Sequence, residues 1–252
     1  MQEDIKLPVI KFLGFRMHAA TMQDTVKVIL ERIECCIFTQ HVVVNVAKLV
    51  NMKADLSLRK SVTSCDIINI DGMGVVWGAR LCRHQVPERV AGIDLFLALI
   101  KEAAKQNLPI FLLGARQEVV AEAATRLLEL QPDLVLAGYH HGYFWENEEE
   151  VVEKIRGSRA TMLFVAITSP KKENFINKWK DQLGVQFVMG VGGSFDVVAG
   201  KIKRAPLFLQ KMGLEWLYRI WQEPNRMWKR YCITNSKYAL MLLQEILKVH
   251  SR

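Results

Sequence analysis

The chain has 252 residues, half of them hydrophobic, which is enough for one large α/β domain or for one domain with an appendage. Its five cysteines show no Cys-x-x-Cys spacing, which argues against a disulfide framework or a cysteine zinc site. There is no apolar run of 18 residues and no signal-peptide pattern, so we expect a cytoplasmic chain without a membrane-spanning helix.

The net charge of +8 is unevenly placed. Residues 200–252 contain eleven Lys or Arg and three acids, which equals the net charge of the whole chain. The first 199 residues are therefore neutral in sum. A basic segment of this kind favours an anionic partner, which is a nucleic acid, a membrane surface or a phosphorylated substrate.

Strand and helix patterns alternate along most of the chain. Apolar and β-branched runs predict buried strands at residues 9–14, 41–46, 66–70, 110–113, 134–137, 162–167 and 185–189. Helical periodicity predicts helices at residues 22–34, 47–52, 73–82, 93–105, 118–130, 146–156 and 171–183. This alternation predicts an α/β fold, with a Rossmann-like, mostly parallel sheet and helices on both faces.

The pattern changes after Pro206. No further strand is indicated, and Pro224 divides two helical stretches at 207–222 and 225–249. Three of the six tryptophans lie here among arginines, a composition typical of a membrane interface. An ordinary helix pair with tryptophans in its core fits the same composition. We divide the chain into a Rossmann-like domain at 1–206 and a basic, Trp-rich helical appendage at 207–252.

Polar residues follow two of the predicted strands where each strand ends. The strand predicted at 41–46 ends at Asn45, and Asp71 follows the strand at 66–70 within the sequence IDGMG. Ligands of parallel sheets bind beyond the carboxyl ends of the strands. Asp71 is therefore a candidate general base that takes a proton from an acceptor hydroxyl. The alternative is a turn aspartate beside a turn glycine.

Two further segments carry charged residues next to predicted helix starts. Arg89, in ERVAGID, can pair with a carboxylate across the site or hold a phosphate, and a local salt bridge is the alternative. Residues 169–173 read SPKKE, so Lys171 and Lys172 are placed to hold an anion at a helix N-terminus. Glu173 can accept hydrogen bonds from a sugar or a base. Capping by Ser169 explains the Ser-Pro pair without a ligand.

The segment GVGGSFDVVAGKIKRAP follows the last predicted strand. Gly192 and Gly193 allow the backbone to approach a diphosphate closely, and Asp196 and Arg204 follow them. A tight turn between a strand and a helix explains the glycines equally well.

Several motifs are missing from the sequence. It contains no His-Glu-x-x-His, no Walker loop, no nucleophile elbow, and no Gly-x-Gly-x-x-Gly in the first βα turn. We therefore expect no metal site, and neither covalent catalysis nor a standard dinucleotide fold is indicated.

Taken together, the motifs resemble those of one enzyme family. The matching segments run in the family's order and are NVAKLV, IDGMGVV, ERVAGIDLF, IFLLGA, GYF, SPKKE, GVGGSFDVVAGKIKRAP and GLEWLYRIWQEPNRMWKRY. With them the sequence resembles the WecG/TagA/CpsF glycosyltransferases over about residues 42–231. The resemblance implies a Rossmann-like domain whose C-terminal appendage completes the active site at the membrane.

The same resemblance implies a reaction. It is the inverting transfer of a hexose-type sugar from a UDP-sugar to a polyprenyl-diphosphate-linked acceptor, in bacterial surface polysaccharide biosynthesis. The sugar is N-acetylmannosamine, its uronic acid or glucose. The resemblance implies transfer without a metal, and no cofactor is expected, since UDP-sugar counts as the donor substrate. The implied location is the inner face of the cell membrane, where the protein is peripheral and meets an anionic surface.

The resemblance also assigns residues. The likeness implies Asp71 as the base, with Asp196 and the polar residues of SPKKE around the nucleotide. It implies that three appendage arginines reach the diphosphate, and these are Arg219, Arg226 and Arg230. Val43 stands where the family often has Thr, and Lys172 where it has Gln, so the donor sugar stays open.

Two other classes of protein remain as alternatives. A nucleic-acid-binding protein would explain the basic tail, although no nucleic-acid-binding motif is present and we expect no such partner. A nucleotide-dependent oxidoreductase would fit a doubly wound sheet. The sequence leaves the oligomeric state open, a homo-oligomer included.

Overall fold

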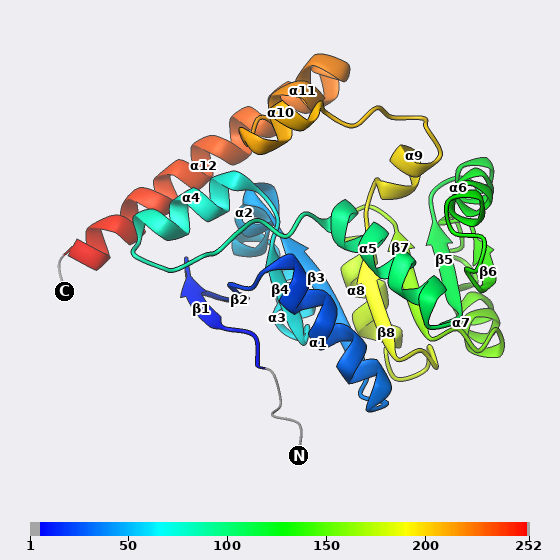
Figure 1. The fold of residues 1–252 in the computed structure, drawn as a ribbon. Coiled ribbons are helices and arrows are strands. Elements are labelled where there is room, and N and C mark those ends of the chain that lie inside the picture. Colours follow the sequence, from blue (N-terminus) through cyan, green and yellow to red (C-terminus); the bar gives the residue numbers. More distant parts are fainter. Residues whose placement is uncertain (1–5, 251–252) are drawn as a thin grey trace.

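The computed structural model describes residues 6–250, apart from the side chains of residues 211, 226, 230, 249 and 250. Its strands form one eight-stranded sheet in the order β1-β2-β4-β3-β8-β7-β5-β6 (Figure 1). Every neighbouring pair is parallel except β1 and β2. The strands are β1 (Val9–Phe12), β2 (Phe15–His18), β3 (Thr39–Val44), β4 (Ile67–Ile70), β5 (Ile110–Gly114), β6 (Leu136–His140), β7 (Met162–Ala166) and β8 (Phe187–Gly190).

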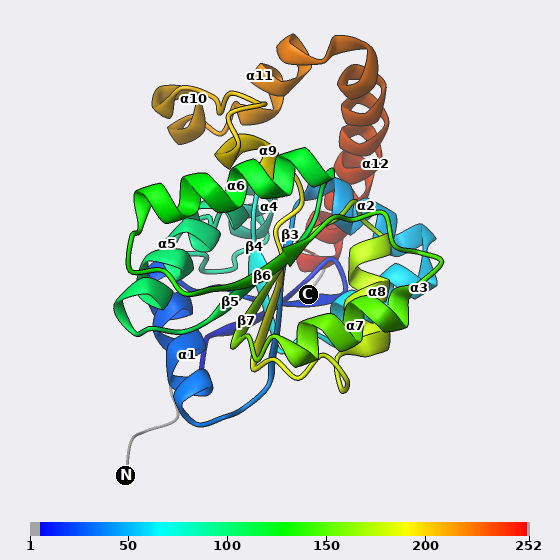
Figure 2. The same ribbon diagram turned by 90° about the vertical axis from the view of Figure 1, so that its right-hand side faces the viewer.

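Helices cover both faces of this sheet, as Figures 1 and 2 show. They are α1 (Met22–Glu34), α2 (Val46–Ala54), α3 (Leu56–Thr63), α4 (Met73–Leu81), α5 (Gly92–Lys105), α6 (Gln117–Leu130), α7 (Glu148–Gly157), α8 (Lys171–Trp179) and α9 (Ser194–Val198), followed by α10 (Leu207–Lys211), α11 (Glu215–Gln222) and α12 (Pro224–His250). The predicted α/β fold with a mostly parallel sheet and a helical C-terminal part is confirmed.

The core divides into two layers because successive strand residues point to opposite faces. In β7, Met162 and Phe164 pack with α1, α5 and α6 on one face. Leu163 and Val165 pack with α7 and α8 on the other face. All four side chains are buried, so β7 is a central strand that reads as an unbroken apolar run.

The first strand differs from its prediction. Residues 9–14 were expected to form one strand, but the chain turns at Leu13 and Gly14 and returns as β2. Both turn residues have positive φ, 54° and 83°, as a two-residue hairpin turn requires. Leu-Gly is not one of the usual sequence signals for this turn, which explains why the hairpin was missed.

Helix α3 was also missed. Its eight residues begin at the cap Asp55, whose Oδ1 atom accepts a hydrogen bond from the backbone N–H of Leu58 at 2.9 Å. Leu58 and Val62 are its buried apolar side chains. Two apolar positions in two turns give a weak periodicity, so the sequence pattern does not distinguish this helix from a loop.

The largest other differences from the predicted boundaries are in β6 and α8. Strand β6 occupies 136–140 and not 134–137, since it lies at the edge of the sheet and its half-exposed residues include Gly138 and His140. Helix α8 ends at Trp179, four residues earlier than expected.

The appendage contains three helices instead of the two expected. Gly213, with φ of +71°, separates α10 from α11, and Pro224 begins α12. Pro224 is suited to a helix start, because the missing N–H would have no partner within the helix.

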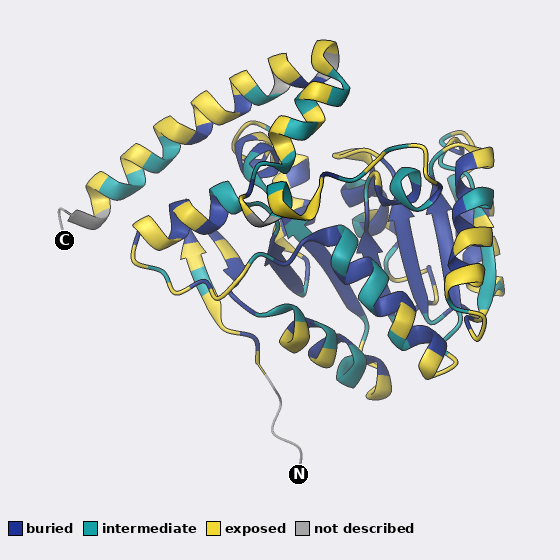
Figure 3. Cartoon of the chain, turned by 45° about the horizontal axis from the view of Figure 1, so that its top comes forward, coloured by how far each residue is buried: buried dark blue, intermediate teal, exposed yellow. Residues whose placement is uncertain are grey.

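The last helix packs against the α/β domain. Its side chains Tyr238, Met241, Leu242 and Ile246 contact the core cluster formed with β1, β2, α2 and α4. Tyr238 is 7% exposed, and its hydroxyl donates a hydrogen bond to the carbonyl oxygen of Gly74 at 2.9 Å. In Figure 3, α12 alternates between buried or half-buried and exposed residues along its length. The domain boundary at 206/207 stays a prediction, but α12 is anchored to the domain.

We predict that Gly78→Ala loosens α12. A Cβ atom at Gly78, in α4, would collide with the Tyr238 hydroxyl and lie 3.1 Å from Phe12 Cζ. Overpacking of this kind costs about 1–3 kcal/mol, so urea unfolding should show a lower free energy of unfolding.

The control is Gly157→Ala at the end of α7, where an added Cβ meets no atom within 4 Å. This variant should be as stable as the wild type or more stable, because alanine is the better helix former. A Gly78→Ala variant as stable as the control would contradict the packing of α12 on α4.

Candidate active site

Asn45 and Asp71 lie side by side at the carboxyl edge of the sheet. They directly follow β3 and β4, which are parallel neighbours with Val44 opposite Ile70. The backbone N–H of Asp71 donates to the carbonyl oxygen of Val44 at 2.8 Å. The expected convergence of these two strand ends is therefore present in the structure.

Asn45 also begins helix α2. Its Oδ1 atom accepts a hydrogen bond from the backbone N–H of Lys48 at 3.0 Å, which makes Asn45 the helix cap. Gly72, which follows Asp71, lies against it, because a Cβ atom at Gly72 would be 3.5 Å from Asn45 Cβ. A contact between Asn45 and a substrate stays a prediction.

The Asp71 side chain is half-buried among charged groups. Burial raises its pKa above the usual range. The guanidinium of Arg89 and the backbone N–H of Gly92, 3.4 Å from Oδ2, act in the opposite direction. Glu215 raises the pKa further, and Arg219 lowers it. A carboxylate with a raised pKa is a stronger base than an ordinary aspartate once it has lost its proton.

Arg89 pairs with a carboxylate across the site. Its Nη1 atom lies 2.5 Å from Oε2 of Glu215, the first residue of α11. The sequence left open whether Arg89 pairs across the site or forms a local salt bridge. The structure shows a pair with a distant segment of the chain. Glu215 itself was not predicted, although it lies in the GLEWLYR segment.

Arg204 joins the same group of charges. It donates two hydrogen bonds to Asp94 at 2.5 and 2.7 Å, and its Nε atom lies 3.7 Å from Oε1 of Glu215. The hydrogen bonds that Arg204 donates to Asp94 raise the pKa of Arg204. We call the set of Arg89, Asp94, Arg204 and Glu215 the charge bridge. It links the chain before α5, α5 itself, the segment after α9, and α11.

Helix α8 contributes a buried ion cluster. Oε1 of Glu173 lies 2.8 Å from Lys48 Nζ and 2.9 Å from Lys172 Nζ. Burial alone would raise the pKa of Glu173, but the two ammonium groups outweigh it and lower the pKa to about 2. Lys172 therefore points inward. A ligand contact of Glu173 stays a prediction, and Lys171 lies over the Trp145 ring at 4.8 Å.

The glycine turn after β8 reaches the same edge of the sheet, because β8 pairs with β3. Gly192 has φ of +55°, which favours glycine, whereas Gly193 has φ of −79°. Both glycines were expected to serve the backbone conformation of this turn, but only Gly192 has a φ that favours glycine. Asp196 follows in α9.

The structure describes the side chain of only one of the three appendage arginines. Arg219, in α11, is exposed and close enough to influence Asp71. Arg226 and Arg230 lie in the first turns of α12, but their side chains are outside the described part of the structure. Their contact with a diphosphate stays a prediction.

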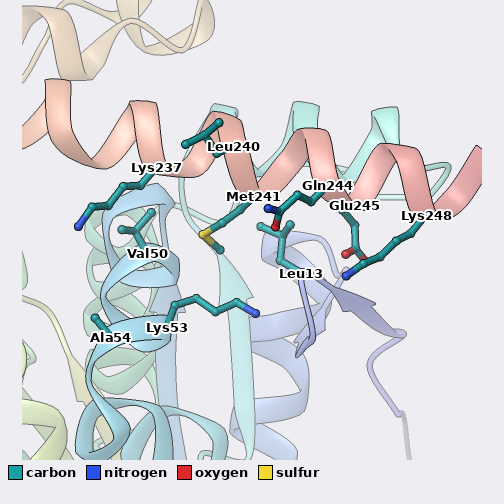
Figure 4. A pocket seen from close by; sticks show the side chains of 10 residues that line it. All are labelled: Leu13, Val50, Lys53, Ala54, Lys237, Leu240, Met241, Gln244, Glu245 and Lys248. Carbon is teal, nitrogen blue, oxygen red and sulfur yellow. The ribbon is translucent and has the colours of Figure 1, made fainter.

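A separate groove lies away from these residues. It has a volume of about 410 Å³ and lies between α2, α12 and the β1–β2 turn (Figure 4). Leu13, Val50 and Met241 form apolar parts of its wall, and Lys53 and Lys237 extend beside them. None of the predicted site residues lines this groove.

Residues 6–250 contain neither a candidate metal cluster nor a helix that could span a membrane. No three His, Cys, Asp or Glu side chains in this part of the chain come together in a way that could hold a metal ion. No helix in the same range is long and apolar enough to cross a membrane.

A parallel sheet with a carboxylate, a glycine turn and arginines at its carboxyl edge is typical of transferases that act on phosphorylated substrates. The chain belongs to the WecG/TagA/CpsF family of glycosyl transferases, whose model matches residues 10–252. The resemblance inferred from the motifs is thereby confirmed. Membership of this family argues against the two alternatives, a nucleic-acid-binding protein and an oxidoreductase.

Two curated relatives carry the name N-acetylglucosaminyldiphosphoundecaprenol N-acetyl-beta-D-mannosaminyltransferase. The protein from Bacillus spizizenii (strain W23) is 38% identical over 182 residues, which cover 72% of this chain and 70% of the relative. The protein from Bacillus subtilis (strain 168) is 37% identical over 183 residues, which cover 73% and 70%.

The buried ion cluster generates a prediction about pH. The folded-state pKa of Glu173 is about 2 and the ordinary value is 4.5, so its ion pairs stabilise the fold above pH 4.5. This contribution is lost as the pH falls from 4.5 toward 2. Glu173→Gln should therefore lose less unfolding free energy than the wild type between about pH 5 and pH 3.

At neutral pH the same variant should be less stable by about 3–5 kcal/mol, because two buried ammonium groups lose the carboxylate charge between them. Glu118→Gln, at an exposed ion pair with Arg116, should follow the wild type at every pH. Equal pH slopes for the wild type and Glu173→Gln in denaturant titrations would show that the cluster is not charged as described.

Proposed function

We propose that the chain is an inverting hexosyltransferase that moves an N-acetylmannosamine-type sugar from UDP to a polyprenyl-diphosphate-linked acceptor. The observation that carries this proposal is Asp71, a carboxylate with a raised pKa at the carboxyl edge of the sheet, facing arginines. The names of the two relatives support the acceptor class and the sugar, since each specifies a diphosphoundecaprenol acceptor and a mannosaminyl group. They name no donor nucleotide, and UDP is our proposal.

In the proposed reaction, Asp71 takes the proton of the acceptor hydroxyl as its oxygen attacks the anomeric carbon. The new bond between carbon and oxygen forms on one face of the sugar, and the bond to the UDP phosphate breaks on the opposite face. The configuration therefore inverts. The base supplies the proton transfer, and cations stabilise the charge that develops on the diphosphate.

The cations near Asp71 are suited to that charge. Arg219 is exposed at the site, and the start of α12 brings in Arg226 and Arg230, to which we assign the same role. The chain has no Asp-x-Asp motif, and we propose that guanidinium groups act in place of a metal ion. The glycine turn at Gly192 is the proposed seat of the nucleotide.

We further propose that the appendage rests on an anionic membrane surface on the cytoplasmic side. Trp221 and Trp228 are 76% and 61% exposed, although tryptophan is usually well buried. On α12, Leu240, Leu243 and Leu247 are exposed on the side opposite the packed stripe. Exposed tryptophans and leucines among cations match the chemistry of a lipid interface.

The central prediction concerns Asp71→Asn. The amide cannot accept the proton, so transfer to a lipid-diphosphate acceptor should fall about a hundred- to ten-thousandfold. UDP binding, measured by calorimetry, should change little, because the substitution keeps the size of the side chain. A variant that retains more than half of the wild-type turnover would refute the assignment of Asp71 as the base.

A second prediction concerns the membrane. The double variant Trp221→Ser/Trp228→Ser should bind anionic vesicles about tenfold more weakly or worse in co-sedimentation, because two interfacial side chains are lost. High salt should weaken binding of the wild type as well.

The matched control is Leu130→Ser, which removes an equally exposed side chain (64%) at the end of α6 on the α/β domain. It should sediment like the wild type. If the control and the double variant lose binding to the same degree, the appendage is not the membrane-facing surface.

A further inference from the structure

We infer that Glu215 is a positioning residue that holds helix α11 over Asp71 by binding two arginines of the α/β domain. The two arginines are Arg89 and Arg204. The inference rests on the proposed role of Asp71 as the base. It adds to that role a residue which itself contacts neither substrate nor the reacting atoms.

The contacts of Glu215 are divided between its two oxygens. Oε2 lies 2.5 Å from Arg89 Nη1, and Oε1 lies 3.7 Å from Arg204 Nε. The three side chains are only 13–25% exposed. Pairs between guanidinium and carboxylate groups are stronger when they are shielded from water than at an open surface.

The other contacts of helix α11 are mainly with α10 and α12, where its Trp216 ring lies 5.9 Å from the Tyr231 ring, and few are with the α/β domain. None of its residues is buried, so no apolar side chain of α11 is anchored in the core. Its other polar link to the segment after α9 is a hydrogen bond from Gln222 to the carbonyl oxygen of Lys203 at 3.0 Å. The chain before it, at Gly213, packs against Met73 in α4. Glu215 is therefore the main direct link between α11 and the α/β domain at the site.

The two arginines are not equivalent. Arg204 is also fixed by its two hydrogen bonds to Asp94, so it keeps its place without Glu215. Arg89 has its ion pair with Glu215 and also faces Asp71. Removal of the Glu215 charge therefore leaves the Arg89 charge uncompensated beside the proposed base.

The charges around Asp71 give this change a direction. Arg89 and Arg219 face Asp71 and lower its pKa, and Glu215 raises it. Arg204 is also close enough for Asp71 to influence it, but its charge is balanced by Asp94. Loss of the Glu215 charge lowers the pKa of Asp71, and a base with a lower pKa is weaker.

The test is Glu215→Gln, which keeps the shape of the side chain and removes its charge. We expect kcat to fall roughly ten- to a hundredfold, because the base becomes weaker and the appendage arginines lose their placement. The acidic limb of the kcat–pH profile should move to lower pH, because activity requires Asp71 without its proton. Glu215→Asp, which restores the charge, should recover part of the rate.

A second readout does not need substrate. Amide hydrogen exchange in residues 215–222 should be faster in Glu215→Gln than in the wild type, because α11 is held less firmly. The matched control is Glu245→Gln on α12, which makes the same change of charge in the appendage but at the separate groove beside α2. It should resemble the wild type in rate, pH profile and exchange.

The outcomes separate the two proposals. If Glu215→Gln matches Glu245→Gln in rate, pH profile and exchange, the positioning role of Glu215 is wrong. If the wild type itself transfers no sugar, the proposed function fails, and the exchange measurement alone decides whether Glu215 holds α11. Faster exchange would then support that role, and unchanged exchange would overturn it.

Discussion

The parallel pairing of β3 with β4 is the constraint on which the site depends. Because Val44 lies opposite Ile70, the residues that follow both strands emerge next to each other at one edge of the sheet. Asn45 then begins α2, and Asp71 meets the chain at Gly92. A shift in this register would separate Asp71 from the helix start, whatever the rest of the chain did.

The appendage brings further basic residues to the α/β domain. The α/β domain supplies a carboxylate and arginines, and residues 200–252 add eleven Lys or Arg against three acids. Helix α12 is fixed by apolar packing around Tyr238, whereas α11 is fixed by the charge bridge. An apolar anchor at one end and ion pairs at the other place the appendage over Asp71 and leave its tryptophans exposed.

The sequence predicted those parts of the structure whose signals are local. Buried strands such as β7 and the candidate base after β4 follow from apolar runs and from the polar residues that end them. The β1–β2 hairpin and α3 were missed because their turn and periodicity are weak. Glu215 was missed for another reason. Its partner Arg89 is 126 residues away, and no spacing rule in a single sequence connects them.

The most direct test of the account is the product of the reaction. The purified chain is incubated with a lipid-linked N-acetylglucosaminyl diphosphate and, in turn, with each member of a panel of UDP-sugars, and the lipid is analysed by mass spectrometry. The account predicts that UDP-N-acetylmannosamine adds one N-acetylhexosamine to the lipid and releases UDP. A folded protein that modifies the lipid with no UDP-sugar of the panel would contradict it.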